Sequence, residues 1–112
     1  RAERDPHPDP AGIPGGRGLA VMELLPHAHL PHDHPDLPFC LMAGPLSGTT
    51  TPLCGRAVAA GVSPLTRTLF DAQLGGRLAF ELAKSGLSGL VVTGRAEAPS
   101  GLVVADGRAR LT

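Results

Sequence analysis

Hydrophobic residues recur at every fourth position within Leu74–Ser85, where Leu78 and Leu82 follow Leu74. Residues four positions apart lie on one face of an α-helix, so this spacing predicts a helix with one apolar side. Gly86 follows directly, at a position where helices commonly end in a left-handed residue. We therefore expect Leu74–Ser85 to be the main helix of the fold.

A shorter helix is expected near the beginning of the chain. Leu19, Met22 and Leu25 have the spacing of one helical face, and Pro26 cannot continue the helix, so the spacing predicts a helix over Leu19–Leu25. Residues 1–14 before it carry four prolines and mixed charges without a hydrophobic period. We expect residues 1–12 to form a disordered lead-in.

Short apolar runs separated by turn residues predict strands in the rest of the chain. Asp106-Gly107 is typical of a tight turn, so Arg108–Leu111 should return as a hairpin partner of the last run. Strands on both sides of one main helix indicate an α+β fold with a small mixed or antiparallel sheet that includes the hairpin. The predicted strands are Leu37–Ala43, Arg56–Val62, Gly89–Thr93 and Gly101–Ala105.

Composition limits the classes of function. Ten basic residues balance ten acidic residues, so no net charge would attract nucleic acid or an anionic membrane. Aromatic residues make up 3% of the 112 residues, too few for a base-stacking surface, and no apolar run approaches the roughly 20 residues of a membrane span. Two cysteines, Cys40 and Cys54, do not make a disulfide framework. We expect a cytoplasmic protein that binds neither nucleic acid nor membrane.

Four histidines lie close together at His27, His29, His32 and His34. Imidazole nitrogens are good ligands for zinc, nickel and copper. Prolines interrupt the segment, however, and no neighbouring residue is suited to orient each ring. A solvated loop that binds metal only adventitiously is the preferred interpretation, and a functional metal site is the alternative.

Two features suggest binding of an anion. Gly75 and Gly76 lie at the start of the expected main helix, where a ligand can approach the backbone, although they would equally allow close packing of the helix on a strand. Arg56 follows a glycine-rich turn and is a candidate for gripping a phosphate, with an ordinary surface charge as the alternative. Gly15–Gly18 offers a weaker site of the same kind. No residue pattern typical of a catalytic nucleophile is present, so we assign no catalytic residue.

Several short motifs occur in an order and spacing that resemble the N-terminal domain of the tungsten-containing aldehyde ferredoxin oxidoreductases. The resemblance covers residues 13–112, which we expect to be a partial domain, the first of its two similar α+β halves. The motifs are GGRGLA at Gly15–Ala20, AGPLSGT at Ala43–Thr49, CGR at Cys54–Arg56, SPLT at Ser63–Thr66, DAQLGG at Asp71–Gly76, ELAKSGLSGLVVTGRAEAP at Glu81–Pro99 and VVADGRARL at Val103–Leu111.

The resemblance implies an oxidoreductase that oxidises aldehydes to carboxylic acids. It implies a tungsten or molybdenum atom held by two pterins, a magnesium ion that bridges the pterin phosphates, and a 4Fe-4S cluster that passes electrons to ferredoxin. This segment would contribute to the base that binds the pterin phosphates, together with the remaining domains of the enzyme. Cys40 and Cys54 match none of the cluster ligands of the family, so the cluster is expected in later domains.

Site residues follow from the resemblance position by position. Arg56 matches an arginine that contacts the pterin phosphates, Gly75 matches a glycine of the pterin-contacting loop, and Gly76 follows it. Gln73 stands where other members have an asparagine whose carbonyl helps to hold the magnesium. Gln73 keeps the amide but adds a methylene group.

Gln73 and two further departures from the family pattern support an alternative function. Ala57 and Arg77 stand where aromatic residues are common in the family. A non-catalytic relic or accessory protein that keeps the fold without binding the cofactor would tolerate such changes. This alternative remains open beside the pterin-dependent oxidoreductase.

Overall fold

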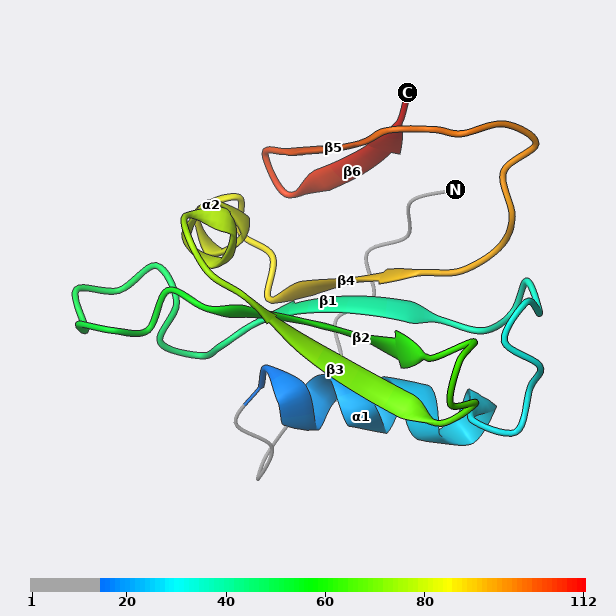
Figure 1. Ribbon diagram of the computed structural model, residues 1–112. Helices are drawn as coiled ribbons and strands as arrows, with labels where there is room; N and C mark the ends of the chain where they lie inside the picture. The colour runs from blue at the N-terminus through cyan, green and yellow to red at the C-terminus, as the bar shows by residue number, and fades with distance from the viewer. Residues whose placement is uncertain (1–14) are drawn as a thin grey trace.

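A computed structural model describes residues 15–112, and an antiparallel four-stranded sheet forms its centre (Figure 1). The strand order is β3-β2-β1-β4, and each neighbouring pair of strands is antiparallel. The expected lead-in, residues 1–12, lies outside the described residues. The sheet strands are β1 (Phe39–Ala43), β2 (Ala57–Val62), β3 (Leu69–Leu74) and β4 (Gly89–Val92); the other elements are α1 (Arg17–Leu24), the 3-10 turn η1 (Leu25–His27), α2 (Leu78–Lys84), β5 (Leu102–Ala105) and β6 (Arg108–Leu111).

The α+β class is as predicted, and the four strands predicted before the Asp106-Gly107 turn all form within two residues of their predicted bounds. The predicted strand at Leu37 begins at Phe39, because Pro38 has no N–H to donate to the sheet. No helix among residues 15–112 combines the length and the apolar character that crossing a bilayer requires.

Helix α1 packs on one face of the sheet, which we call the closed face. Leu24, Ala20 and Cys40 are completely buried there. Alternation along β1 and β2 turns every second residue toward the helix, which gives the sheet a continuous apolar floor. The core of the closed face consists of Leu19, Ala20, Leu24, Cys40, Met42, Val58 and Ala60.

The apolar face of α1 differs from the predicted one. Met22 and Leu25 are 44% and 58% exposed, whereas Ala20 and Leu24 are buried beside Leu19. Ala20 has the smallest apolar side chain of the helix, so turning it toward the sheet lets the two backbones approach closely. Leu25 belongs to the following 3-10 turn and is therefore rotated away from the α1 face.

The opposite face, which we call the open face, is only partly covered. Ala79 and Leu82 of α2 pack against Ala43 and Ala57 at one end of the sheet. The β5–β6 hairpin lies above the sheet on the same side as α2 (Figure 1), and Val104 packs against this cluster.

The hairpin forms at the predicted residues, but it does not join the main sheet. Strands β5 and β6 make a separate two-stranded sheet, in which Leu102 pairs with Leu111 and Ala105 with Arg108. The expectation of one continuous sheet was therefore wrong. The hairpin contributes one side chain, Val104, to the core through its face, and this packing leaves its strand edges unpaired with β4.

The main helix is shorter than predicted, and the strand before it was not predicted. Helix α2 begins at Leu78, four residues after the expected start at Leu74. Leu74 instead pairs with Ala57 as the last residue of β3. Gly76, with a φ of +83°, then turns the chain between strand and helix. The leucines spaced by four thus span a strand, a turn and a helix.

Candidate functional site

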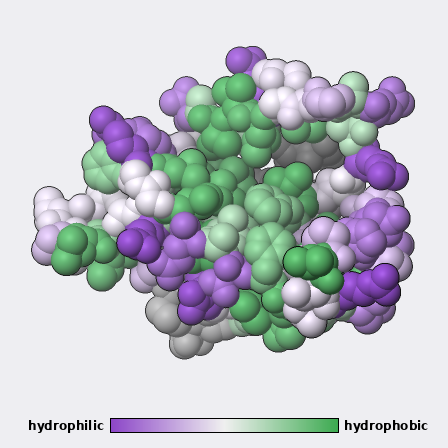
Figure 2. Space-filling view, in the orientation of Figure 1, coloured by the Kyte–Doolittle hydropathy of each residue, from purple (hydrophilic) through white to green (hydrophobic). Residues whose placement is uncertain are grey.

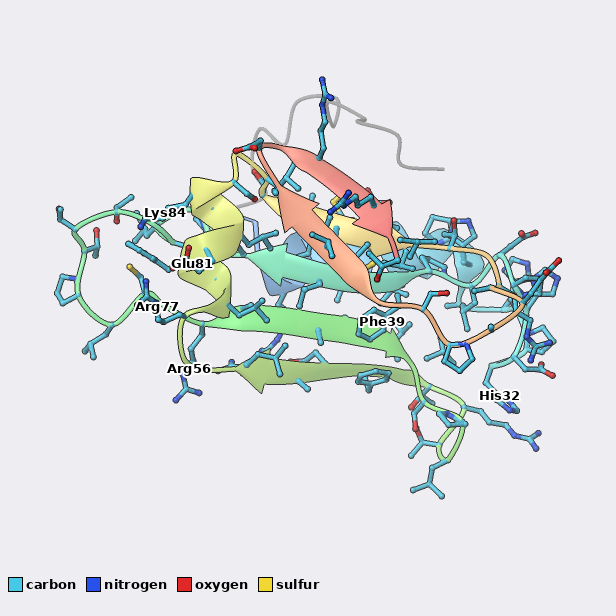
Figure 3. The ribbon with its side chains drawn as sticks, turned by 90° about the horizontal axis from the view of Figure 1, so that it is seen from above. His32, Phe39, Arg56, Arg77, Glu81 and Lys84 are labelled. Atoms are coloured by element: carbon cyan, nitrogen blue, oxygen red, sulfur yellow. The ribbon has the colours of Figure 1, made fainter. Side chains whose placement is uncertain are left out.

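The predicted anion-binding residues meet at one end of the sheet, where β2 begins and β3 ends. Strand β2 begins directly after Arg56, and β3 ends one residue after Gln73. Because these strands are antiparallel neighbours, the start of one lies beside the end of the other. Figure 3 shows Arg56 at this end of the sheet and His32 toward the opposite end.

The backbone before Arg56 is held by a buried hydroxyl group. Ser47 is 8% exposed, and its Oγ donates a hydrogen bond to the Cys54 carbonyl at 3.1 Å. The same oxygen accepts the Gly44 N–H at 3.2 Å. These two bonds close the glycine-rich turn on itself, so the chain enters β2 in a fixed position.

Arg56 is hydrogen-bonded to Gln73. The Arg56 Nη1 donates to the Gln73 Oε1 at 3.0 Å, across the β2–β3 pair. Within residues 15–112, no carboxylate forms an ion pair with Arg56. The guanidinium is exposed and its charge is not neutralised, so it can bind an anion through its remaining N–H groups.

The space beside Gly75 and Gly76 is open. A Cβ atom built at either glycine would meet no other atom within 4 Å, whereas one built at Gly55 would lie 3.6 Å from the Gly76 carbonyl oxygen. The glycine pair therefore passes close to the residue before Arg56 and presents bare backbone on its other side. An exposed cation beside an uncovered backbone suits the phosphate end of a bulky ligand.

The sequence suggested that the glycine pair lies at the start of a helix, but the structure places it before the helix. Arg77 separates it from α2. The Arg77 guanidinium donates to the Glu81 carboxylate at 2.7 Å, and this hydrogen bond lowers the pKa of Glu81. The Arg77 side chain is thus engaged along the helix. The positive charge of Arg56 favours an anion, and the open space beside Gly75 and Gly76 gives a ligand room to approach.

The other glycine-rich segment has a structural role. Gly16 donates its N–H to the Ala43 carbonyl at 3.2 Å, and α1 begins at the next residue. The Arg17 guanidinium forms an ion pair with Asp71 of β3 at 2.8 Å. These contacts attach the start of α1 to the sheet and leave this segment little capacity for an anion.

The histidines do not converge. The His27 Nδ1 lies 3.2 Å from the Glu23 carbonyl oxygen, and the His34 Nδ1 accepts the Asp36 N–H at 3.1 Å. Among residues 15–112, no group of three histidine, cysteine or acidic side chains is arranged to hold a metal ion.

The two cysteines lie in different environments. Cys40 is completely buried in the closed face, and burial raises the pKa of its thiol to about 11, with a smaller contribution from the Glu23 carboxylate. A thiol with so high a pKa is a poor nucleophile at neutral pH. The Cys54 Sγ lies 2.8 Å from the Thr51 carbonyl oxygen and 3.1 Å from the Leu46 carbonyl oxygen, which share its single S–H.

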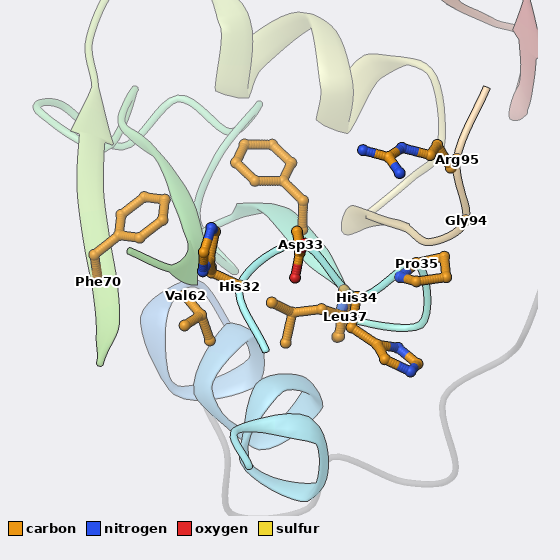
Figure 4. A pocket seen from close by; sticks show the side chains of 12 residues that line it. His32, Asp33, His34, Pro35, Leu37, Val62, Phe70, Gly94 and Arg95 are labelled. Atoms are coloured by element: carbon orange, nitrogen blue, oxygen red, sulfur yellow. The ribbon is translucent and has the colours of Figure 1, made fainter. Parts of the chain in front are cut away.

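The sequence did not reveal a second group of residues, at the opposite end of the sheet. Figure 4 shows the side chains of a pocket of about 230 Å³ at this end. The contributing residues come from distant parts of the sequence, so only the strand register could bring them together. They include His32, Phe39, Gly61, Phe70 and Arg95.

The fold and the site define an α+β domain in which an exposed arginine lies near a bare glycine backbone. The chain belongs to the aldehyde ferredoxin oxidoreductase N-terminal domain family, whose model matches residues 3–112. It is similar to the tungsten-containing aldehyde ferredoxin oxidoreductase of Pyrococcus furiosus, with 37% identity over 94 residues, and to that of Thermococcus kodakarensis, with 34% identity. Both alignments cover 82% of this chain and 16% of the relative.

A solved structure has a similar fold. It is the active site complex BamBC of benzoyl coenzyme A reductase, in complex with 1,5-dienoyl-CoA. The TM-score is 0.77 at 25% sequence identity, and the match covers 87% of this chain and 15% of that chain. This chain thus corresponds to about one sixth of each of these larger proteins.

Proposed function

We propose that this chain forms part of the base that binds the pterin phosphates in a tungsten- or molybdenum-dependent oxidoreductase. The proposal is carried by one observation: Arg56, Gln73 and the Gly75-Gly76 backbone lie together at one end of the sheet, in a chain of this family. An exposed, unneutralised guanidinium beside an open backbone fits a phosphate-bearing cofactor. Arg56 holds the phosphates, and Gly75 and Gly76 let the pterin approach.

Gln73 orients Arg56 in this proposal. Its Oε1 already accepts a hydrogen bond from Arg56, and the longer side chain can also present that oxygen to a magnesium ion between the phosphates. The bound metal–pterin group supplies the redox chemistry. The residues of this chain bind and position it.

The proposed reaction of the complete enzyme is oxidation of an aldehyde to a carboxylic acid in the cytoplasm. Electrons leave through a 4Fe-4S cluster in the remaining domains and pass to ferredoxin. The names of the similar proteins from Pyrococcus and Thermococcus support the aldehyde as substrate. The two cysteines of this chain are too few for a cluster, which usually needs four thiolates.

A second candidate is a part of an enzyme that acts on an aromatic acyl coenzyme A. The fold similarity to BamBC of benzoyl coenzyme A reductase supports it. The relic proposed from Gln73, Ala57 and Arg77 is the non-catalytic alternative. Arg77 adds to it because its guanidinium is engaged with Glu81. Assays of the purified enzyme with aldehydes and with benzoyl coenzyme A distinguish the two reactions.

The experiment is to purify the complete enzyme that contains this chain and to measure tungsten, molybdenum and pterin per polypeptide. A charge-assisted bidentate contact is worth about 1.5–3 kcal/mol, so Arg56→Ala should weaken cofactor retention about tenfold to a hundredfold. Arg56→Lys should recover part of this loss, because an ammonium group lacks the planar fork. Gly75→Val should also lower retention, by placing a branched side chain in the open space.

Arg67→Ala is the matched control. Arg67 lies in the turn between β2 and β3, at the end of the sheet away from Arg56. Its variant should keep the wild-type metal and pterin content. Equal cofactor content in Arg56→Ala and Arg67→Ala would disprove the proposed role of Arg56, and a wild-type enzyme without metal or pterin would favour the relic.

A further inference from the structure

Ser47 is the one polar side chain that is buried among the described residues, 15–112, with 8% of it exposed. It lies in the loop of residues 44–55, which follows β1 and projects at the left of Figure 1. A buried hydroxyl is costly to leave unpaired, so its hydrogen bonds indicate what it does in the fold. The Ser47 Oγ donates to the Cys54 carbonyl oxygen at 3.1 Å and accepts the Gly44 N–H at 3.2 Å. The hydroxyl therefore joins the two ends of the loop.

The loop itself brings no charge to the cofactor-binding end of the sheet. Residues 44–55 contain no charged side chain, and Arg56 is the first charged residue after them. Figure 2 shows this loop, at the left, in the pale and green colours of weakly polar and hydrophobic residues. An anion at this end is attracted by Arg56 and not by the loop. What the loop can provide is the position of the arginine.

Arg56 lies between two anchored residues. On one side, Ala57 begins β2 and is completely buried within the strand ladder. On the other side, Ser47 holds the carbonyl of Cys54. The two residues between these anchors lie outside the strand, so the ladder does not fix them directly. The direction in which Arg56 leaves the sheet therefore depends on the Ser47 bond as well as on the ladder.

The same loop also lies against the segment that carries the glycine pair. A Cβ atom built at Gly55 would lie 3.6 Å from the Gly76 carbonyl oxygen. Gly48 follows Ser47 and packs against α2, where a built Cβ atom would lie only 2.9 Å from the Ala83 Cβ. Ser47 thus closes a loop that contacts both the helix and the turn before it, which sets the spacing between the arginine and the bare backbone.

A second serine shows what a purely local turn hydroxyl looks like. The Ser63 Oγ accepts the N–H groups of the residues two and three positions later, in the turn between β2 and β3. Its bonds stay within that turn, at the end of the sheet away from Arg56. The bond from Ser47 to Cys54 instead spans seven positions and ends two residues before Arg56. Ser63 is therefore the matched comparison for Ser47.

We propose that Ser47 is a positioning residue for Arg56. By holding the Cys54 carbonyl, it keeps the guanidinium where it can bind the phosphates of the cofactor. The inference rests on the proposed function, because Ser47 acts only through Arg56 and makes no contact of its own with the cofactor. Without the hydroxyl, the Cys54 carbonyl loses its partner and Arg56 takes up several directions. Binding must then also order the arginine, which weakens retention of the cofactor.

The test measures the rate at which metal and pterin leave the complete, folded enzyme during dialysis. Ser47→Ala should lose them about threefold to tenfold faster than the wild type, as expected for one lost hydrogen bond. Ser47→Thr keeps the hydroxyl and should stay close to wild type. Ser63→Ala removes a turn hydroxyl at the other end of the sheet and should also stay close to wild type. Equal rates in Ser47→Ala and Ser63→Ala would overturn the proposal.

A second arm separates positioning from a general effect on the fold. In the Arg56→Ala background, Ser47→Ala should cause no further acceleration, because no guanidinium remains to be positioned. A further acceleration as large as that in the wild-type background would overturn the proposal. If Ser47→Ala does not fold, Ser47→Cys replaces it in both arms, since a thiol fills the same space with a weaker donor. Its loss should be at least about twofold faster than wild type, and a wild-type rate would overturn the proposal.

Failure of this inference and failure of the proposed function give different results. If Arg56→Ala accelerates the loss of cofactor and Ser47→Ala does not, Arg56 binds the phosphates without help from Ser47. If Arg56→Ala retains the cofactor as the wild type does, the proposed function fails and this inference fails with it.

Discussion

The two faces of the central sheet differ in how completely they are covered. On the closed face, α1 buries Leu24, Ala20 and Cys40 completely. On the open face, α2 and the hairpin cover one end, and Phe39 and Phe70 remain more than a third exposed at the other. The difference indicates that the closed face stabilises the domain, whereas the open face leaves apolar side chains accessible to solvent.

The proposed cofactor-binding residues lie outside the packed core. Arg56, Gln73 and the glycine pair are at the end of the sheet, in segments whose side chains face solvent. Their positions depend on the β2–β3 register and on the turn held by Ser47. A substitution in the closed face should therefore lower the free energy of unfolding, and a substitution at the Arg56 end of the sheet should weaken binding of the proposed cofactor.

The largest expected effect on the stability of the chain comes from Leu24→Ala. Leu24 is completely buried between α1 and the sheet, so truncation removes apolar contacts and leaves a cavity. The free energy of unfolding should fall by about 2–5 kcal/mol. Denaturation by guanidinium chloride measures it. Met22→Ala on the exposed side of the same helix is the control, and an equal loss there would contradict the distinction between the two sides of α1.

A pH dependence should follow from Cys40. Its pKa is about 11 in the folded chain, against 9.0 for an ordinary cysteine. Below pH 9 the thiol is protonated in both states, and stability is unaffected. As the pH rises from 9 to 11, the unfolded chain loses this proton and the folded chain keeps it, so the free energy of unfolding falls by about 2–3 kcal/mol.

Unfolding measurements between pH 8 and pH 11 check this dependence. The chain contains no tyrosine, which removes one group that titrates in this range. Cys40→Ala should have a flatter profile than the wild type, while Cys54→Ala should keep the fall. A wild-type profile that is flat from pH 9 to 11 would show that Cys40 is less well shielded from water than the closed face implies.

The smallest effect is expected from Phe39→Ala on the open face. Phe39 is 45% exposed, so the chain loses only about half of the roughly 1.5–3 kcal/mol that full burial of such a side chain provides. The free energy of unfolding of the 112-residue chain should fall by about 1 kcal/mol. A loss as large as that of Leu24→Ala would mean that the open face stabilises the domain as much as the closed face does.

The sequence alone determined those parts of the fold that depend on local patterns. The apolar runs of β1, β2 and β4, and the Asp106-Gly107 turn of the hairpin, form close to their predicted positions. The order of the short motifs identified the family, which the family model and the relatives confirm. Each of these signals lies within a few neighbouring residues or in their linear order.

Strand β3 shows where local reasoning failed. Leu74, Leu78 and Leu82 have helical spacing, but Leu74 is paired with Ala57 in the sheet. The β ladder satisfies the backbone groups of Leu74, and the turn at Gly76 separates it from the helix. A clue was available in Phe70, Ala72 and Leu74, whose alternation before two glycines is typical of a strand.

The tertiary structure decided which residues meet. Arg56 and Gln73 are 17 positions apart, and their hydrogen bond depends on the pairing of β2 with β3. Phe39, Gly61 and Phe70 come together for the same reason, because antiparallel register sets residues from three strands in one row. The pattern of hydrophobic and polar residues along the chain indicates which face of a strand a residue occupies. The pairing between distant strands determines which residue is its neighbour across the sheet.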